Sequence, residues 1–307
     1  PTLMELAPRD MVSRAAQTEI DEGRGIGGKD YVFIDVSHLG ADKIMSRLPQ
    51  ITDLARNFAG VDPFKEPIPI QPTAHYSMGG IPADKHCHVW ADKDTRLEGM
   101  YAAGECSCIS VHGANRLGTN SLLEAVTFGR VAGKAIVEDL PNLTFEDLPE
   151  GAGEEAGVEI ATILKADGSE KAAKIRDDLQ VTMMDRCGVF RNGKDLQDQL
   201  DYVRECQARY KNIKVDDKGE KFNSDMMEAI ELGHLLDFSE VVVLGALERE
   251  ECRGAHYRKD FEKDGKGIRD DDKWLKHTLA FRDEEGKIRL DFKPVVITKF
   301  QPMERKY

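Results

Sequence analysis

The 307-residue sequence lacks a long apolar run: its longest, over residues 241–247, is far shorter than the roughly 18 residues of a membrane-spanning helix. Basic residues are also in deficit, since 43 Lys and Arg face 56 Asp and Glu and give a formal net charge of −13. An acidic surface argues against general binding to nucleic acids or to anionic membranes. We therefore predict no direct membrane span and no nucleic-acid partner.

Cysteine is scarce as well, with six residues in the whole chain. Disulfide frameworks belong to small secreted domains, so we expect reduced thiols, as in cytosolic proteins. The clusters His86-Cys87-His88 and Cys106-x-Cys108 resemble metal-binding patterns. However, neighbouring side chains on a strand point to opposite faces, and no second pair completes a four-ligand set. We predict no metal site.

What the sequence does contain is typical of globular proteins, with 40% hydrophobic and 32% charged residues. At about 150 residues per domain, the length suggests about two domains. Pro149, Gly151 and Gly153 have the composition of a linker. Helical periodicity predicts helices over residues 10–22, 41–47, 51–59, 121–138, 154–166, 170–181, 194–210 and 223–249. Strands are predicted over 31–36 and in short pieces between 68 and 103. From about residue 277 onward the apolar pattern shortens to a period of two, as at 288–292 and then at 295–297, which predicts further strands.

One G-x-G-x-x-G pattern occupies residues 23–28. A dinucleotide-binding fingerprint follows a strand and opens a helix, because the pyrophosphate binds at the helix N-terminus. Here the order is reversed, with a predicted helix before the glycines and a predicted strand after them. This pattern therefore indicates a glycine-rich turn.

A second glycine-rich loop, over residues 112–120, leads directly into the helix predicted at 121–138. Ser121 and Glu124 have the spacing of a capping box. The N-terminus of a helix offers N–H donors and a partial positive charge, which suit an anion or an electron-rich ring edge. Arg116, just upstream, can bind a carboxylate through two N–H groups. An ordinary capped helix beside a surface arginine explains the same residues equally well.

Two further segments have both a functional and a structural interpretation. His75 precedes Gly79-Gly80, where a backbone without side chains can approach a ligand, although a lone histidine is more often structural. Arg9 and Asp10 stand at the start of a predicted helix. Capping preference alone favours Asp10 as the N-cap beside a solvated arginine.

Four ordered segments together resemble the flavoprotein subunit of succinate dehydrogenase and fumarate reductase. They are LAPRD around Arg9, PTAHYSMGG around His75, AAGEC around Glu105 and HGANRLGTNSL around Arg116. The similarity continues through RGAHYRKDF (253–261) and LKHTLAFRDEEGKIRLDF (275–292), so it covers essentially the whole chain. It is nearest to the quinol:fumarate reductase branch.

The resemblance implies an α/β plus α fold and the C-terminal portion of such a subunit. The family's first FAD-binding strand, its G-x-G-x-x-G turn and its flavin-linking histidine loop have no counterpart in this sequence. The implied domains are the second part of the capping (substrate) domain over 1–70, the C-terminal segment of the FAD-binding domain over 71–150, a helical domain over 151–250 and a small β-containing C-terminal domain over 251–307.

The resemblance also implies FAD as cofactor and the interconversion of succinate and fumarate by hydride transfer. By matching motif, Arg9 corresponds to the family's proton-transferring arginine, and His75 and Arg116 to the clamp on a substrate carboxylate. The FAD contacts correspond to Glu105, Ser121 and Leu122. The implied partners are an iron–sulfur subunit, which passes electrons to quinone, and membrane anchor subunits. These would place the protein peripherally at the cytoplasmic face of the inner or cell membrane.

Two alternatives remain open. L-aspartate oxidase shares much of the motif set, but that family usually has cysteine in place of Met78 and alanine in place of Gly118. The long C-terminal region also fits the respiratory enzymes better. Alternatively, the chain by itself is an inactive fragment that serves as a scaffold or assembly surface, in which case the isolated polypeptide would bind little flavin.

Overall fold

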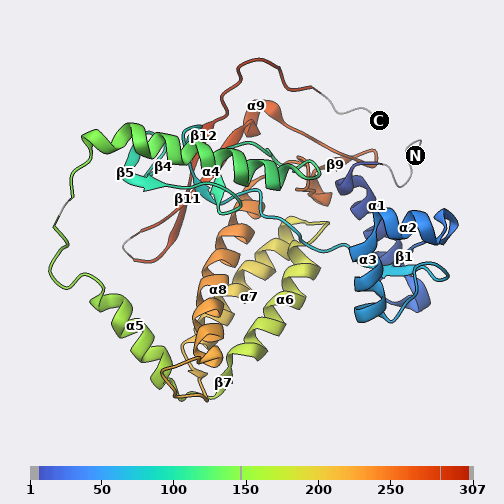
Figure 1. Cartoon of the computed structure of the whole chain (residues 1–307), viewed down its shortest axis with the longest axis horizontal. Coiled ribbons are helices and arrows are strands. Elements are labelled where there is room, and N and C mark those ends of the chain that lie inside the picture. Colours follow the sequence, from blue (N-terminus) through green and yellow to red (C-terminus); the bar gives the residue numbers. More distant parts are fainter. Residues whose placement is uncertain (1–6, 146, 284, 304–307) are drawn as a thin grey trace. The chain divides into compact units, whose positions relative to one another are not determined.

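The computed structural model describes residues 7–145, 147–283 and 285–303, and it divides the chain into two compact units. Unit 1 contains residues 1–74 and 303–307, and unit 2 contains residues 75–302. The elements of both units are labelled in Figure 1. The four-domain division expected from the sequence stays a prediction.

Unit 1 begins with helix α1 (Arg9–Asp21) and continues through the glycine-rich segment into strand β1 (Val32–Ile34). The glycines form a turn with a short 3₁₀ helix at Ile26–Gly28, as predicted from the order of helix and strand. β1 pairs antiparallel with β2 (Ile68–Ile70). The connection between them contains α2 (Ala41–Arg47), α3 (Pro49–Leu54) and a π-helical turn at Ala55–Ala59.

Unit 2 opens with short paired strands and a long helix. β3 (Ile81–Pro82) pairs in parallel with β6 (Ser107–Cys108), and β4 (His88–Trp90) pairs antiparallel with β5 (Arg96–Tyr101). α4 (Asn120–Asp139) follows. Ala83, Val89 and Ala102 form the core of this segment.

The ring of His88, in the histidine and cysteine cluster at 86–88, is held between two carboxylates. Both ring nitrogens of His88 face carboxylates, with Nδ1 3.2 Å from Asp84 Oδ2 and Nε2 2.8 Å from Asp139 Oδ2. Asp139 also accepts a 2.6 Å hydrogen bond from the Tyr101 hydroxyl, so these contacts join the β4–β5 hairpin to the end of α4. No three His, Cys, Asp or Glu side chains in the described ranges are arranged to hold a metal ion. All six cysteines are free thiols.

The next part of unit 2 is helical: α5 (Glu154–Lys165), α6 (Ala172–Cys187), α7 (Gly193–Tyr210) and α8 (Ser224–Glu248). α6, α7 and α8 lie side by side in Figure 1 and bury a shared core that includes Ile175, Val203, Leu232 and Leu236. Short strands β7 (Glu170–Lys171) and β8 (Ile213–Lys214) pair in parallel. In the part of the chain that the structure describes, no helix has both the length and the apolar character needed to cross a membrane.

α6 extends to Cys187 instead of ending near residue 181 as predicted. Cys187 is buried with Leu196 and Val243, so the last turns of α6 pack into a second core cluster. The helix ends at Gly188, where a Cβ atom would lie only 2.2 Å from the carbonyl oxygen of Met184.

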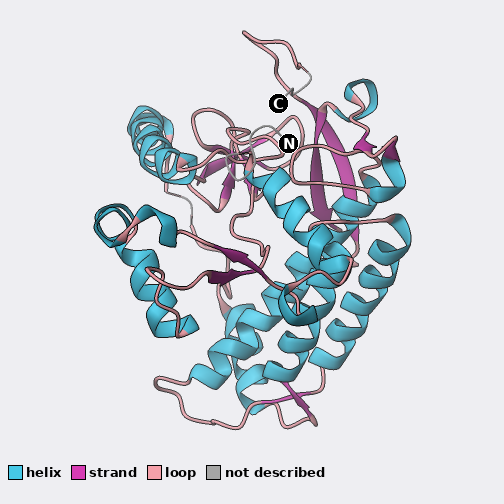
Figure 2. Cartoon of the chain, turned by 90° about the vertical axis from the view of Figure 1, so that its right-hand side faces the viewer, coloured by secondary structure: helices cyan, strands magenta, loops and turns pink. Residues whose placement is uncertain are grey.

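The last segment contains α9 (Asp271–Trp274), a small hairpin of β9 (Glu262–Lys263) and β10 (Lys266–Gly267), and a longer one of β11 (Lys276–Arg282) and β12 (Ile288–Pro294). Figure 2 shows β11 and β12 as the longest strands beside the helices. The strand pattern predicted from about residue 277 onward is confirmed by β11 and β12, but its extension to 295–297 is wrong. Pro294 forms the last pair, with Lys276. No residue of β11 remains beyond Lys276 to pair with, and proline itself donates no ladder hydrogen bond.

Candidate functional site

Arg9 is the first residue of α1 in unit 1, and its side chain is exposed. Pro8 occupies the N-cap position, and no side chain caps the helix. Asp10 is buried in the first turn and accepts a 2.7 Å hydrogen bond from Arg14 Nη2. The interpretation of Asp10 as an N-cap is therefore wrong. Within the described residues, no carboxylate forms an ion pair with Arg9.

His75 and Arg116 both belong to unit 2, in the loops that precede β3 and α4. His75 is exposed, whereas Arg116 is partly buried. The backbone N–H of Arg116 donates to Met78 Sδ at 3.1 Å, and the Arg116 guanidinium carbon lies 4.7 Å from the centre of the Tyr76 ring. The structure therefore brings the loop of His75 and the loop of Arg116 together through Tyr76 and Met78.

The guanidinium of Arg116 retains free donors. Its Nη1 donates to the carbonyl of Leu117 at 3.2 Å and to Ser121 Oγ at 3.4 Å. No carboxylate of the described residues lies within ion-pair distance of it. A partly buried guanidinium without a carboxylate partner is suited to binding an anionic group of a ligand.

A buried polar network beneath Arg116 is not recognised from the sequence. The Tyr76 hydroxyl donates to Glu124 Oε2 at 2.7 Å, and His112 Nε2 lies 2.6 Å from the same oxygen. The side chains of His112 and Glu124 are only 4% and 2% exposed. Burial and the hydrogen bond to Glu124 raise the pKa of Tyr76 to about 12, so its hydroxyl keeps its proton and remains a donor at neutral pH.

The capping box predicted from Ser121 and Glu124 is wrong. α4 begins one residue earlier, at Asn120, with Thr119 at the N-cap in a left-handed conformation (φ 65°) and no side-chain cap. Ser121 Oγ accepts from Arg116, and Glu124 turns inward to Tyr76 and His112. In the first turn of α4 the N–H groups of Asn120 and Leu122 donate to the carbonyls of Leu117 and Thr119 at 3.2 and 3.1 Å. The Ser121 N–H has no acceptor among the described residues and is available to a ligand.

Glu105 and Leu122 are exposed, and Ser121 is partly buried. Glu105 lies in the turn between β5 and β6, and the other two lie in the first turn of α4. An exposed carboxylate can accept hydrogen bonds from ligand hydroxyls. Nearby, a Cβ atom at Gly80 would lie 2.4 Å from the carbonyl oxygen of Cys106, so the second glycine of the His75 loop allows close packing against the Glu105 turn.

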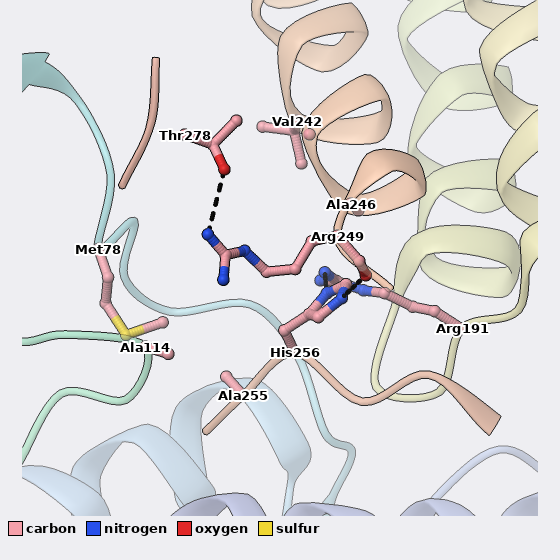
Figure 3. Close-up of a pocket in the computed structure, with 10 residues that line it drawn as sticks. Met78, Ala114, Arg191, Val242, Ala246, Arg249, Ala255, His256 and Thr278 are labelled. Carbon is pink, nitrogen blue, oxygen red and sulfur yellow. Dashed lines mark hydrogen bonds between the residues drawn. The ribbon is translucent and has the colours of Figure 1, made fainter. Parts of the chain in front are cut away.

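A cavity of about 290 Å³ adjoins these loops (Figure 3). Met78 and Ala114 line it on one side, and the remaining lining residues come from the segment after α6, from α8, from the turn at 253–256 and from β11. Arg249 Nη2 donates to Thr278 Oγ1 at 3.2 Å across its wall. Sequence reasoning did not identify this cavity, although the quoted RGAHYRKDF segment contains His256.

The polar groups of the cavity are occupied by other parts of unit 2. Arg191 Nη1 donates to His256 Nδ1 at 3.0 Å, and His256 Nε2 donates to the Arg249 carbonyl at 2.9 Å. Burial and the neighbouring arginines lower the pKa of His256 to about 4, which keeps the ring neutral at pH 7. Arg191 Nε also donates to the Gly188 carbonyl at 3.1 Å, where a cation is favourable beside the C-terminus of α6.

Comparisons with known proteins extend over the whole chain. Residues 2–122 match the FAD binding domain family, and residues 176–307 match the family described as fumarate reductase flavoprotein C-term. The fumarate reductase flavoprotein subunit of a Serratia species is 45% identical, with 99% of this chain and 50% of the relative covered. The mitochondrial succinate dehydrogenase flavoprotein subunit of rice is 40% identical, with 100% of this chain and 50% of the relative covered.

Solved structures agree with these relatives. A variant of Escherichia coli quinol fumarate reductase superimposes with a TM-score of 0.88 at 43% identity, over 98% of this chain and 51% of the matched chain. Sdh1 of Mycobacterium smegmatis superimposes with a TM-score of 0.76 at 31% identity, over 95% of this chain and 47% of that chain. The chain spans about half the length of the curated relatives it matches. It belongs to the family of fumarate reductase and succinate dehydrogenase flavoprotein subunits.

Proposed function

We propose that the full-length subunit interconverts succinate and fumarate and that His75 and Arg116 bind one carboxylate of the substrate. This proposal rests mainly on the burial and the hydrogen-bond contacts of the Arg116 guanidinium. Its guanidinium is partly buried, retains free donors and has no carboxylate partner among the described residues, while two contacts join its loop to the loop of His75. Two donors on one carboxylate orient the substrate and withdraw charge from its double bond.

The residues at the start of α4 fit the flavin cofactor of the family. Ser121, whose N–H has no acceptor among the described residues, and exposed Leu122 can contact an electron-rich ring edge at this uncapped helix start, and exposed Glu105 can accept from ribose hydroxyls. Bound FAD supplies the redox chemistry by accepting a hydride from one substrate carbon or returning it. The match of residues 2–122 to the FAD binding domain supports this assignment.

Arg9 is the proposed proton-transfer residue. Oxidation of succinate removes a hydride from one carbon and a proton from its neighbour, and reduction of fumarate adds both. An arginine has a solution pKa above 12, so it takes part in proton transfer only through a relay of other groups and in a cavity shielded from water. The absence of an ion pair between Arg9 and any described carboxylate leaves its guanidinium available for this role.

The domains of the chain and the partner subunits are proposed from the family to which the chain belongs. We assign residues 1–70 to the capping domain, 71–150 to the FAD-binding domain, 151–250 to a helical domain and 251–307 to a C-terminal domain. The proposed partners are an iron–sulfur subunit and membrane anchor subunits, with electrons passing to quinone. A second matched structure is named as a quinol–fumarate reductase with menaquinol molecules, which supports a quinone as the redox partner. On this proposal the subunit is held at the cytoplasmic face of the membrane by its partners.

The visible absorption spectrum of the full-length subunit tests the function. Anaerobic succinate should bleach a flavin band, and fumarate should restore it. Bleaching by aspartate in the absence of any response to succinate would instead favour an L-aspartate oxidase. A preparation without flavin would contradict the proposal and favour a scaffold.

A further inference from the structure

We propose that Tyr76, held in place by Glu124 and His112, is a positioning residue that fixes the guanidinium of Arg116 for binding a substrate carboxylate. This inference rests on the proposed function of Arg116 and deepens it. It concerns the face of Arg116 that contacts the protein, whereas the proposed function concerns the donors that face the ligand.

Few contacts other than Tyr76 hold the Arg116 side chain in place. Both of its side-chain hydrogen bonds come from Nη1, and the longer one, to Ser121 Oγ, measures 3.4 Å. No described carboxylate forms an ion pair with it. The guanidinium lies over the ring of Tyr76, whose centre is 4.7 Å from the guanidinium carbon. A guanidinium stacked on an aromatic face is held in orientation while its N–H edge remains free.

The Tyr76 ring is itself held in place at its hydroxyl end. Its hydroxyl donates to Glu124 at 2.7 Å, and the ring packs edge-on against His112, with ring centres 5.3 Å apart and planes at 88°. His112 lies 2.6 Å from the same oxygen of Glu124. Since both partners are almost completely buried, these contacts are shielded from water and give the ring a single orientation.

Tyr76 lies between segments that carry other proposed contacts. It directly follows His75, the other proposed substrate contact, and Glu124 projects from α4, whose first turn carries the proposed flavin contacts. The hydrogen bond from Tyr76 to Glu124 thus joins the His75 loop to the flavin-facing helix, and the stacking contact adds the Arg116 loop. One side chain fixes the relative placement of all three segments.

The chain offers a matched control for this side chain. Tyr101 is also in unit 2, also donates to a carboxylate, at 2.6 Å from Asp139, and its pKa is likewise raised to about 12, chiefly by that hydrogen bond. Its ring packs against His88, away from the Arg116 loop. Tyr76→Phe and Tyr101→Phe therefore remove the same chemical group from a hydrogen bond to a carboxylate, with and without a contact to Arg116.

The experiment compares these variants in the full-length flavin-loaded subunit. We expect Tyr76→Phe to raise the KM for succinate and the Kd for malonate, a non-reacting dicarboxylate, about threefold, and Tyr76→Leu to raise both about tenfold. We expect kcat to fall by less than KM rises, because Arg116 itself remains and the variants chiefly weaken its hold on the bound carboxylate. Tyr101→Phe should change neither constant. Flavin content and thermal midpoint check that each variant is folded.

A double-mutant cycle separates positioning from general loss of structure. In an Arg116→Gln background, Tyr76→Leu should add less than about twofold to the Kd for malonate, because the residue through which it acts is already missing. An undiminished tenfold effect there, or equal effects of Tyr76→Phe and Tyr101→Phe, would overturn the inference. Wild-type protein that does not respond to succinate would overturn the proposed function and this inference with it. Normal wild-type turnover with an unchanged KM in Tyr76→Leu would overturn the inference alone.

Discussion

Gly254 packs directly against the carbonyl of Ala114: a Cβ atom at residue 254 would lie 2.4 Å from the Ala114 oxygen. The same oxygen accepts a 2.9 Å hydrogen bond from the backbone N–H of Ala255. The turn at 253–256 is thereby held against the loop that carries Arg116. The geometry of the proposed carboxylate site therefore depends on a segment more than 100 residues further along the chain.

Gly254→Ala should lower both stability and dicarboxylate affinity. Gly254 has φ +60°, which strains any other residue, and the new Cβ atom would also displace the Ala114 loop. Gly265→Ala is the matched control, since Gly265 has φ +73° but open space within 4 Å of the position that a Cβ atom would take. We expect Gly265→Ala to cost about 1 kcal/mol and Gly254→Ala about 3 kcal/mol or more. Thermal midpoints and malonate titrations measure the difference, and equal losses would contradict the role of the close contact.

Arg116→Ala should abolish most dicarboxylate binding and leave FAD bound. Loss of two charge-assisted hydrogen bonds corresponds to a rise of about 100-fold in the Kd for malonate. Arg130→Ala removes the same charge from an exposed position on α4 and serves as the control. Flavin absorbance and malonate-induced spectral changes give the two readouts. Unchanged affinity in Arg116→Ala would count against a substrate clamp.

Arg9→Ala should remove turnover while FAD and dicarboxylate still bind. A residue that transfers a proton in the reaction lowers kcat when it is lost, and general acid–base groups typically contribute about 10² to 10⁴ in rate. Arg24→Ala, which removes another exposed arginine of unit 1, is expected to retain normal kcat. Steady-state kinetics with succinate separates the two variants. Substantial turnover in Arg9→Ala would exclude the proton-transfer role.

The helices of this protein are predictable from the sequence because their signals are local. α2 and α7 begin and end within a residue of the predicted spans, since apolar spacing and flanking glycines lie within or beside the segments themselves. The strand predicted at 295–297 fails because a strand also needs a partner, and β11 offers none beyond Lys276. An apolar pattern carries no information about that partner.

The candidate site, like the fold, is predictable from the sequence only where the signal is local. Arg9, His75, Glu105 and Arg116 are found from sequence motifs, and their roles remain predictions. The network that surrounds Arg116 joins Tyr76 to residues 36 and 48 positions away, His112 and Glu124. The local spacing of Glu124 from Ser121 suggests a capping role, whereas its long-range contacts decide where the side chain points. Local spacing cannot reveal a contact that only the tertiary fold creates.

His256 should make the protein less stable as the pH falls from about 6.5 to about 4. Burial and the adjacent arginines lower its pKa to about 4 in the folded state, against an ordinary value near 6.5. In that interval the unfolded chain binds a proton that the folded chain does not, so acidification favours unfolding. Between pH 6.5 and pH 5 the difference amounts to about 2 kcal/mol. His256→Gln, which can still accept from Arg191 and donate to Arg249, should lose less stability over this range.

Thermal midpoints at pH 7 and pH 5 provide the measurement, with His86→Gln as the control because His86 is exposed. Wild type and His86→Gln should show the same drop in midpoint on acidification, and His256→Gln a smaller one. An identical drop in all three proteins would mean that His256 is protonated in the folded state. The Arg191–His256–Arg249 contacts would then need a different arrangement of protons, since a protonated ring has no acceptor for Arg191.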